Sequence, residues 1–422
     1  MRFNEVMRKA QRVRGRIREQ GSRRALAFSL LRLSEMLYQE REFISDSDWD
    51  SLIYDDLATS MPPKPTQASV GSSSAIGRMG RINWLIPIVG PNTGGVATII
   101  QLAPVLAAHG YESTICVINQ QQQPEDAVRY EQMFRASYAS TGLAIRVLNR
   151  PLELSQIPAA AITVATAWPT AYIVDRLAIP TKKMYLVQDY EPWFHANGSN
   201  ALLAAHSYTL DLHHISLGNW LQEELFIRYG KASFPLGFPV DTAAFAPRPT
   251  TRSQRFRVAM YVRRSTERRS VNLGILALRQ FAAQVGKDAE VLLFGEAGLP
   301  AREGFTILGP LSQSQCVALY SSVDVVMSLS ATNMSLIPME ASACGATVLE
   351  LNLPPVRKHL THLQTAYLAE PYPEAISSGL LHLYSDRSLC SDIARRGREA
   401  VLAQPTWAAI GEALVGYLQS EL

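Results

Sequence analysis

The chain has 422 residues, of which 47% are hydrophobic and 18% charged, and its mean hydropathy is close to zero. This composition is typical of a globular protein and excludes disordered and fibrous classes, and the length predicts two or three domains. The four cysteines are isolated, with no Cys-x-x-Cys and no Cys/His cluster at zinc spacing. We therefore expect neither a disulfide framework nor a structural metal, and a reducing cytosol fits best.

The net charge of +3 is unevenly distributed along the chain. The first 24 residues carry nine Lys/Arg against Glu5 and Glu19, a local charge of +7, which leaves the remainder at −4. A mildly acidic body of this kind is a poor nucleic-acid binder. The start also lacks the apolar core and small-residue cleavage site of a secretory signal, so export is not expected.

The basic N-terminus predicts an amphipathic extension over residues 1–60. Apolar residues recur at helical spacing among the arginines of residues 3–17, and a second amphipathic stretch covers residues 26–37. Three interpretations remain open: a peripheral helix on anionic lipid, a solvated basic arm, or a helix packed on the body. Residues 61–80, rich in Pro, Ser and Gly without periodicity, predict a flexible linker.

From residue 81 the chain alternates short apolar runs with helical patterns, which is typical of a parallel α/β sheet. A first crossover helix is expected over residues 95–109, ending before Gly110. The uncharged run 154–174 is long enough for a membrane span, but its prolines favour a buried strand followed by a helix that Pro169 opens. The predicted strands of this block are residues 82–88, 113–118, 145–148, 162–167, 183–187 and 214–217.

Three prolines in residues 238–249 interrupt this rhythm, and we place an interdomain linker at 241–254. The sequence thus predicts two tandem doubly wound α/β domains, at 81–240 and 255–405, with a ligand cleft at the carboxyl ends of their strands. A last helix, expected over residues 407–418, would pack back on the first domain as part of segment 406–422. The predicted strands of the second block are residues 257–262, 290–294, 306–308, 323–327 and 347–351.

Two loops have the composition of anion-binding sites. Residues 89–95 (VGPNTGG) follow the first strand and lead into a helix, so their backbone amides could approach a ligand, although the glycine spacing is not the dinucleotide fingerprint. Residues 262–269 (VRRSTERR) place four arginines after the first strand of the second domain. Guanidinium groups there suit a diphosphate, and the alternative is a solvated loop in which Glu267 neutralises one charge.

Residues 327–345 (MSLSATNMSLIPMEASACG) form the most informative stretch. A strand ends near Ser328, and a helix begins near Ser335, where Pro338 is tolerated because it lies in the first turn. Free amides at the helix start would hold a phosphate, and Glu340, one turn deeper, would bind a sugar hydroxyl. The alternative for Glu340 is a surface glutamate near a helix N-terminus.

Residues 188–194 (QDYEPWF) place Asp189 and Glu191 beside three aromatic side chains. Aromatic rings cover the apolar faces of sugars while carboxylates accept hydrogen bonds from their hydroxyls, so this loop suits a carbohydrate. The alternative is an interface loop with a buried aromatic anchor.

Taken in order, these motifs resemble the two-domain GT-B glycosyltransferases of family 4. The resemblance rests on GGV at 94–96, on Arg263 with Arg268, on LGPLS at 308–312 and on SLIPMEASACG at 335–345. Further motifs are similar to the rhamnosyltransferases that build bacterial cell-surface glycans from dTDP-L-rhamnose: TAWPTAY at 166–172, VQDYEPWF at 187–194 and YVRRSTERR at 261–269.

The resemblance covers residues 81–418 and implies roles for individual residues. Arg263 and Arg268 would hold the donor diphosphate, Glu340 the nucleotide's sugar, and residues 308–311 would flank the base. The chain departs from the family pattern at Val262, where a glycine is common, and at Thr332, where a glutamate is common. The candidate donor-binding residues are Gly94, Gly95, Val96, Arg263, Arg264, Arg268, Gly295, Leu308, Gly309, Leu311, Thr332, Met334, Ser335, Leu336 and Glu340.

The expected activity is a metal-independent transfer of a deoxyhexose, foremost L-rhamnose, to a hydroxyl of a growing cell-surface glycan; the resemblance implies that the anomeric configuration is retained. Asp189, Glu191, Arg263 and Arg268 are the candidate catalytic residues, and the two carboxylates would orient the acceptor hydroxyl. No cofactor is expected beyond the nucleotide-sugar substrate. Two alternatives are a non-catalytic nucleotide-sugar-binding scaffold and a GT-B nucleotide-sugar epimerase. The expected location is the cytoplasm, with residues 1–37 on the inner membrane face if the acceptor is lipid-linked.

Overall fold

The structure is a computed structural model that describes residues 80–87, 94–119, 124–149, 152–250, 253–298 and 304–421. The expected N-terminal helices, the linker up to residue 79 and residues 88–93 of the glycine loop lie outside this part of the chain. Residues Ile53–Leu422 form one compact unit, to which every element below belongs.

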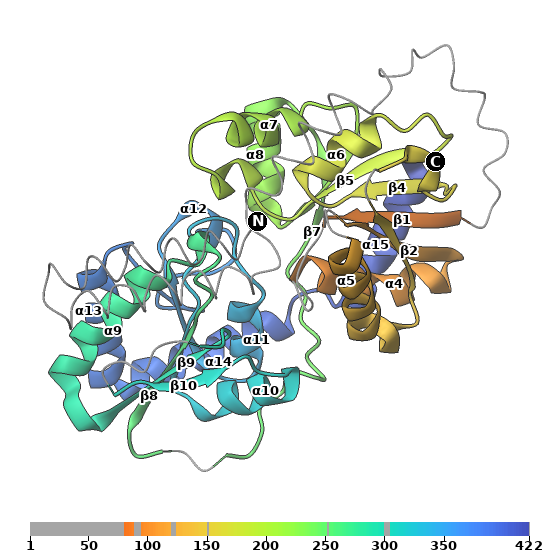
Figure 1. The fold of residues 1–422 in the computed structure, drawn as a ribbon. Coiled ribbons are helices and arrows are strands. Elements are labelled where there is room, and N and C mark those ends of the chain that lie inside the picture. The colour runs from red at the N-terminus through yellow and green to blue at the C-terminus, as the bar shows by residue number, and fades with distance from the viewer. Residues whose placement is uncertain are drawn as a thin grey trace, which may run out of the picture. The chain divides into compact units, whose positions relative to one another are not determined.

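A parallel sheet of seven strands organises the first half of the described chain, in the order β3-β2-β1-β4-β5-β6-β7 (Figure 1). We call this half the first domain. Its helices are α4 (Gly94–Ala108), α5 (Pro124–Tyr138), α6 (Trp168–Asp175), α7 (Ser199–Ser207) and α8 (Asn219–Tyr229), with short 3-10 turns η2 (Ala139–Thr141), η3 (Leu154–Gln156) and η4 (Glu191–Phe194). Its strands are β1 (Gly80–Ile86), β2 (Tyr111–Asn119), β3 (Ala144–Asn149), β4 (Ile162–Ala165), β5 (Lys182–Val187), β6 (His213–Leu217) and β7 (Ser233–Leu236).

A second parallel sheet, of six strands in the order β10-β9-β8-β11-β12-β13, organises what we call the second domain. Its helices are α9 (Val271–Val285), α10 (Gln313–Ser322), α11 (Ile337–Ala343), α12 (Pro354–Arg357), α13 (Pro373–Ser385) and α14 (Arg387–Leu402), with turns η5 (Glu267–Arg269) and η6 (Gly286–Asp288). Its strands are β8 (Phe256–Tyr261), β9 (Ala289–Phe294), β10 (Thr306–Gly309), β11 (Val325–Met327), β12 (Thr347–Leu351) and β13 (Tyr367–Ala369).

Both sheets share one topology, and it confirms the prediction of two doubly wound α/β domains. In each, the chain starts in the middle, runs to one edge and then returns to build the other side, so the order reverses between β1 and β4 and between β8 and β11. Ligands of open α/β sheets bind at this reversal, outside the carboxyl ends of the strands. The loops after β8 and β11 are therefore the place to look for a site.

Local sequence explains the helix ends that position these loops. Helix α4 is followed by Gly110 at φ +83°, the left-handed residue expected there. Pro169 lies in the first turn of α6, as expected. Helix α10 begins with a capping box in which Ser312 Oγ accepts from the Gln315 amide while the Gln315 side chain accepts from the Ser312 amide.

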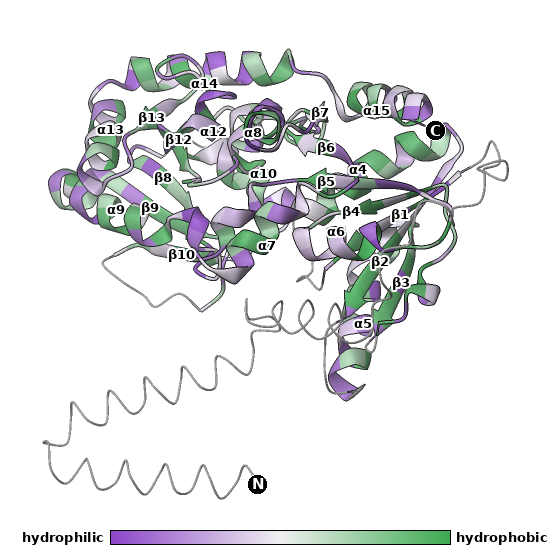
Figure 2. Cartoon of the chain, turned by 90° about the horizontal axis from the view of Figure 1, so that it is seen from above, coloured by the Kyte–Doolittle hydropathy of each residue, from purple (hydrophilic) through white to green (hydrophobic). Residues whose placement is uncertain are grey.

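The central strands are apolar on both faces because helices cover both sides of each sheet. Strands β4 and β12 are buried along their whole length, and Figure 2 shows the green, hydrophobic strands between mixed green and purple helices. Two strands were missed by the sequence prediction, β7 and β13. Each is a sheet edge of three or four residues, and β7 contains Pro235, which a strand tolerates at an edge.

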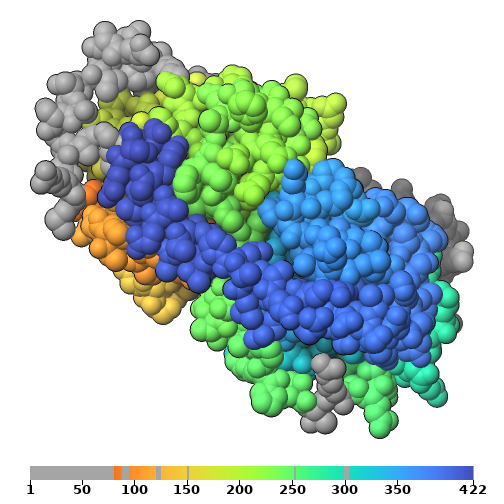
Figure 3. All heavy atoms as spheres, turned by 180° about the vertical axis from the view of Figure 1, so that it is seen from behind, coloured from red at the N-terminus to blue at the C-terminus, as the bar shows by residue number. Residues whose placement is uncertain are grey.

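The last helix, α15 (Trp407–Glu421), packs against α4 and β7 of the first domain. Figure 3 shows this dark blue segment beside the orange residues of α4. The contact is close: a Cβ on Gly411 would lie 2.7 Å from Val105, and the Tyr417 ring stacks on Phe234 with centroids 4.8 Å apart. Searching the described residues finds no helix with the length and apolar character needed to cross a membrane.

Candidate functional site

Of the four arginines after β8, Arg264 and Arg269 bond to protein side chains, whereas Arg263 and Arg268 keep unfilled donors. Arg264 is bound by Glu296, which lies 2.7 Å from its Nη2 and also accepts from its backbone amide. Arg269 donates from Nη1 to Ser330 Oγ at 2.8 Å. Arg263 has no hydrogen bond or ion pair from its side chain to any described residue. Glu296, and not Glu267 as the solvated-loop alternative supposed, pairs with Arg264, and the expected contact of Arg264 with a donor stays a prediction.

Arg268 lies deeper and is oriented by the first domain. Its guanidinium stacks on the Phe194 ring, 3.8 Å from the centroid, and its Nε lies 3.4 Å from Asp189 Oδ2 without hydrogen-bond alignment. Burial lowers the pKa of Arg268, and Asp189 opposes this shift. No described residue accepts a hydrogen bond from the two terminal nitrogens of Arg268. Arg263 and Arg268 therefore present unfilled guanidinium donors, which is the chemistry that binds a diphosphate.

The loop after β11 supplies the second part of the site. No described residue accepts from the backbone amides of Met334, Ser335 and Leu336, which precede α11, while Ser335 Oγ pairs with Ser328 Oγ at 2.9 Å. The loop touches the arginine loop directly, since the Ala331 amide donates to the Arg268 carbonyl at 2.9 Å. Because β8 and β11 are neighbours at the reversal of strand order, the two candidate anion-binding segments lie at one edge of the second sheet.

Glu340 stands in the first turn of α11, half-buried near Tyr320, Cys316 and Cys344. Burial raises the pKa of Glu340 to about 7. No described residue hydrogen-bonds its carboxylate. A desolvated carboxylate without a hydrogen-bond partner can accept a ligand hydroxyl. The expected contact of Glu340 with the nucleotide's sugar stays a prediction.

Asp189 joins the two domains, and this corrects the expectation that it contacts an acceptor. Its Oδ1 accepts from the Tyr190 and Asn333 amides, both at 2.8 Å. Its Oδ2 accepts from Thr332 Oγ1 at 2.8 Å and faces Arg268. A carboxylate offers about four acceptor positions; three of them accept protein hydrogen bonds, and Asp189 is 8% exposed and faces Arg268. Thr332, expected to bind the donor, has its hydroxyl committed to the same contact and is 2% exposed.

We expected Glu191 to orient the acceptor hydroxyl, but the structure buries it and bonds both of its oxygens to protein groups. It is 4% exposed, and its two oxygens accept from the Trp168 amide at 2.6 Å and the Tyr185 hydroxyl at 2.8 Å. Burial raises the pKa of Glu191 to about 8, although both hydrogen bonds lower it. Of the neighbouring aromatics, Trp193 is 45% exposed, whereas Phe194 stacks on Arg268.

The remaining candidates lie at the edges of the site. Gly95 approaches the Gln188 side chain so closely that a Cβ would lie 2.7 Å from its Nε2. Val96 is 2% exposed and packs in the core, so its side chain is not available to a ligand, and Gly94 is the first residue of α4. Gly295 donates its amide to the Gly309 carbonyl at 2.8 Å and so joins the ends of β9 and β10. Leu308 is exposed and Leu311 half-buried on that side of the sheet.

Glu350 holds the start of the loop after β11 by accepting from the Ser330 amide. It lies on β12, fully buried, with Oε1 accepting from the Ser330 and Leu351 amides and Oε2 without a partner. Burial raises the pKa of Glu350 to about 7, while the two amides and Arg269 lower it. Sequence reasoning missed this residue and Asn333. Asn333 bonds to backbone carbonyls more than 100 residues away, and Glu350 bonds to the Ser330 amide 20 residues away, which no local pattern reveals.

Glu350 gives a testable pH dependence. The folded chain keeps a proton on Glu350 up to about pH 7, whereas in the unfolded chain this glutamate has its ordinary pKa of 4.5. The free energy of unfolding should therefore fall as the pH rises between these values, by about 1.4 kcal/mol per pH unit. The glutamine in Glu350→Gln cannot ionise, so the free energy of unfolding of this variant should rise relative to that of wild type as the pH increases across this interval. Urea denaturation at pH 5 and pH 8 measures the difference, and parallel behaviour of both proteins would contradict it.

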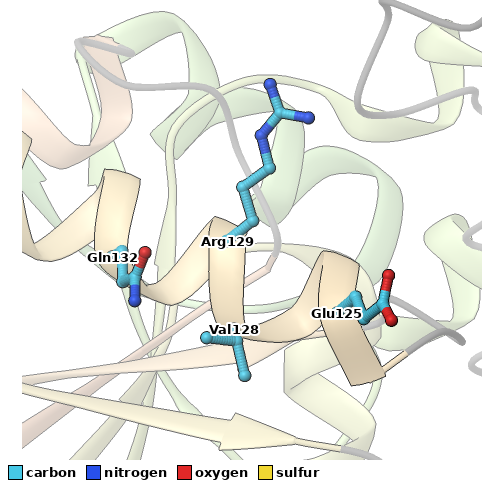
Figure 4. Close-up of a pocket in the computed structure, with 4 residues that line it drawn as sticks. All are labelled: Glu125, Val128, Arg129 and Gln132. Atoms are coloured by element: carbon cyan, nitrogen blue, oxygen red, sulfur yellow. The ribbon is translucent and has the colours of Figure 1, made fainter.

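A shallow hollow of about 430 Å³ lies over α5 and is lined by Glu125, Val128, Arg129 and Gln132 (Figure 4). It contains none of the candidate residues. Among the described residues no group of three or more His, Cys, Asp or Glu side chains is arranged to hold a metal ion.

One sequence relative and two solved structures show what this chain is similar to. The O-antigen biosynthesis protein RfbC from Myxococcus xanthus is 32% identical over 349 residues, which cover 81% of this chain, and the chain spans 27% of the length of that protein. Among solved structures, HepE from Anabaena in complex with UDP and glucose aligns with a TM-score of 0.64 at 13% identity, over 81% of this chain and all of HepE. Sucrose-phosphate synthase from Thermosynechococcus elongatus aligns with a TM-score of 0.59 at 16% identity, over 81% of this chain and 98% of the synthase.

The family comparison covers both domains. Residues 81–220 match the N-terminal domain of WsaF, and residues 256–381 match its C-terminal domain. Together the matches cover more than half of the chain and assign both sheets to one family. The chain therefore belongs to the WsaF family and has the two-domain fold of the GT-B glycosyltransferases.

Proposed function

We propose that the chain is a glycosyltransferase that moves a deoxyhexose, foremost L-rhamnose from dTDP-L-rhamnose, to a hydroxyl of a cell-surface glycan. One observation carries the proposal: Arg263 and Arg268 have unfilled guanidinium donors, and the adjacent loop has three unpaired amides, at the reversal point of the second sheet. Support comes from the relative named for O-antigen biosynthesis and from the resemblance of the loop motifs to rhamnosyltransferases.

The chemistry follows from where charge develops. The bond between the sugar's anomeric carbon and the donor phosphate oxygen breaks, and the acceptor oxygen forms the new bond with retention at that carbon. The acceptor's proton passes to the leaving phosphate oxygen, so no protein carboxylate is required as a base. Arg263, Arg268 and the free amides stabilise the departing diphosphate more strongly than the bound donor, which lowers the barrier. Glu340 holds a hydroxyl of the nucleotide's sugar, and the transfer needs no metal ion.

The location is part of the same proposal. An acceptor carried on a lipid would be met at the inner face of the cytoplasmic membrane, and the basic residues 1–37 have the charge and apolar spacing for anionic lipid. The partners of the enzyme are then a nucleotide sugar and a glycan acceptor, with no nucleic acid.

Calorimetric titration with dTDP, UDP and GDP, each alone and as sugar conjugates, tests the donor class. We expect dTDP-L-rhamnose to bind and to be consumed only when a rhamnosylated acceptor is present. Conversion of the donor without any acceptor would identify an epimerase instead. Binding without transfer across several acceptors would identify a scaffold.

The arginine pairs give a matched mutational test. Arg263→Ala should lower turnover by at least about tenfold, because it removes a donor to the leaving diphosphate. Arg264→Ala removes the same side chain from the next position, where Glu296 already neutralises it, and should stay within about twofold of wild type. Steady-state rates of both variants, compared at equal thermal stability, measure the effect. Equal turnover of the two variants would remove Arg263 from the mechanism.

A further inference from the structure

Asn333 crosses from the second domain to the first with three hydrogen bonds. Its Nδ2 donates to the Gln188 carbonyl at 3.0 Å and to the Leu217 carbonyl at 2.9 Å, and its backbone amide donates to Asp189 Oδ1 at 2.8 Å. Leu217 ends β6 and Gln188 follows β5, which are neighbouring strands. One residue of the second domain is thus fastened to the carboxyl edge of the first sheet, where it is 1% exposed.

The amide group fits this place for a chemical reason. Two buried carbonyl oxygens need two N–H donors from one short side chain, and an amide NH₂ supplies both, while Asn333 Oδ1 has no partner among the described residues. A carboxylate would repel both carbonyls, and a hydroxyl would satisfy one and leave the other buried without a partner.

The bonds of Asn333 are continuous with the donor-binding groups. Its neighbour Thr332 bonds to Asp189, the carboxylate that faces Arg268. Ala331, one residue earlier, bonds to the Arg268 carbonyl. On the other side, Asn333 directly precedes Met334, the first of the three unpaired amides. Both halves of the anion site therefore depend on where this residue is held.

We propose that Asn333 is a positioning residue: by fixing residues 330–336 to the first domain, it sets the place of Arg268 and of the free amides, and donor binding depends on this attachment. The inference rests on the proposed function. The inference goes beyond the proposed function because it makes donor binding depend on a side chain that does not touch the donor.

A second contact between the domains provides the control. Lys358 pairs with Glu223 at 2.7 Å, and both side chains are roughly half exposed. This pair joins α8 to the residue after α12 and has no bond to residues 330–336. Lys358→Ala therefore loosens the domain contact without touching the loop.

The test compares Asn333→Ala, Asn333→Ser and Lys358→Ala in the full chain. Asn333→Ala should raise the KM for dTDP-L-rhamnose by about tenfold, because small misplacements of binding groups are costly, while the acceptor KM changes little. Asn333→Ser keeps one hydrogen-bond donor, so its KM for dTDP-L-rhamnose should lie between those of wild type and Asn333→Ala. Lys358→Ala should stay within about twofold of wild type in both constants. A general loss of folded protein would lower kcat alone.

Hydrogen exchange separates this proposal from the function it rests on. The hydrogen-bonded amides of Ser330, Ala331 and Asn333 should exchange faster in Asn333→Ala than in wild type or Lys358→Ala, whatever the substrate is. If wild type turns over no donor, the proposed function fails while this readout still decides the role of Asn333. Unchanged exchange in Asn333→Ala, or donor KM values equal to wild type, would overturn the proposal.

Discussion

Replacing Arg268 with alanine is expected to lower kcat by about 10² to 10³, the largest effect of any single substitution in the site. The reason is its setting: Phe194 lies under its guanidinium and Asp189 faces its Nε, so the terminal nitrogens are oriented before any ligand arrives. Preorganised donors of this kind act where charge develops in the transition state.

Two further variants sharpen this prediction. Arg268→Lys keeps the positive charge but loses the planar fork, so it should recover only part of the rate. Phe194→Leu removes the stacking surface and leaves the guanidinium in place, so its loss should be smaller than that of Arg268→Ala. Initial rates at saturating donor measure all three, with circular dichroism to confirm folding. An Arg268→Ala enzyme within twofold of wild type would exclude the leaving-group role.

The second large effect concerns stability. Gly295→Ala should lower the free energy of unfolding by about 2 to 5 kcal/mol, the combined cost of backbone strain and overpacking. Gly295 has φ +113°, and a Cβ there would lie 2.5 Å from the Tyr261 ring and 2.7 Å from the Val262 carbonyl oxygen. The Val262 backbone cannot easily move away from the added Cβ, because the Val262 amide donates to the Phe294 carbonyl at 2.7 Å.

Gly230→Ala is the matched control for this substitution. Gly230 also has positive φ, +65°, but no atom lies within 4 Å of its added Cβ. The left-handed conformation alone should cost about 1 to 2 kcal/mol. Urea denaturation of both variants separates strain from crowding. A loss at Gly295 no larger than at Gly230 would show that the ends of β8 and β9 can move apart.

The sequence predicted the elements that depend on local pattern. Buried apolar runs such as residues 291–294 of β9 predict strands directly, and the starts of α6 and α10 have proline or capping residues at fixed positions. Strands β7 and β13 escaped because short edge strands need little apolar sequence.

The site was predicted in part, for a physical reason. Arginine and glycine motifs mark which loops could bind an anion, but they do not say which side chains are already neutralised. Arg263 and Arg264 are adjacent, yet Glu296, far along the chain, decides that only one remains unpaired. Likewise Asp189 is separated from Thr332 by 143 residues, and no local spacing reveals that their hydrogen bond excludes an acceptor hydroxyl.

The packing of α15 has a consequence for biosynthesis. Val105 and Gly411 meet although translation makes one early and the other near the end of the described chain. Until the ribosome has produced α15, the apolar side of α4 lacks its cover, so the first sheet cannot complete its helical layer as it emerges. Folding on the ribosome should therefore begin with the first sheet, continue with the second sheet, and end when α15 packs on α4 of the first domain.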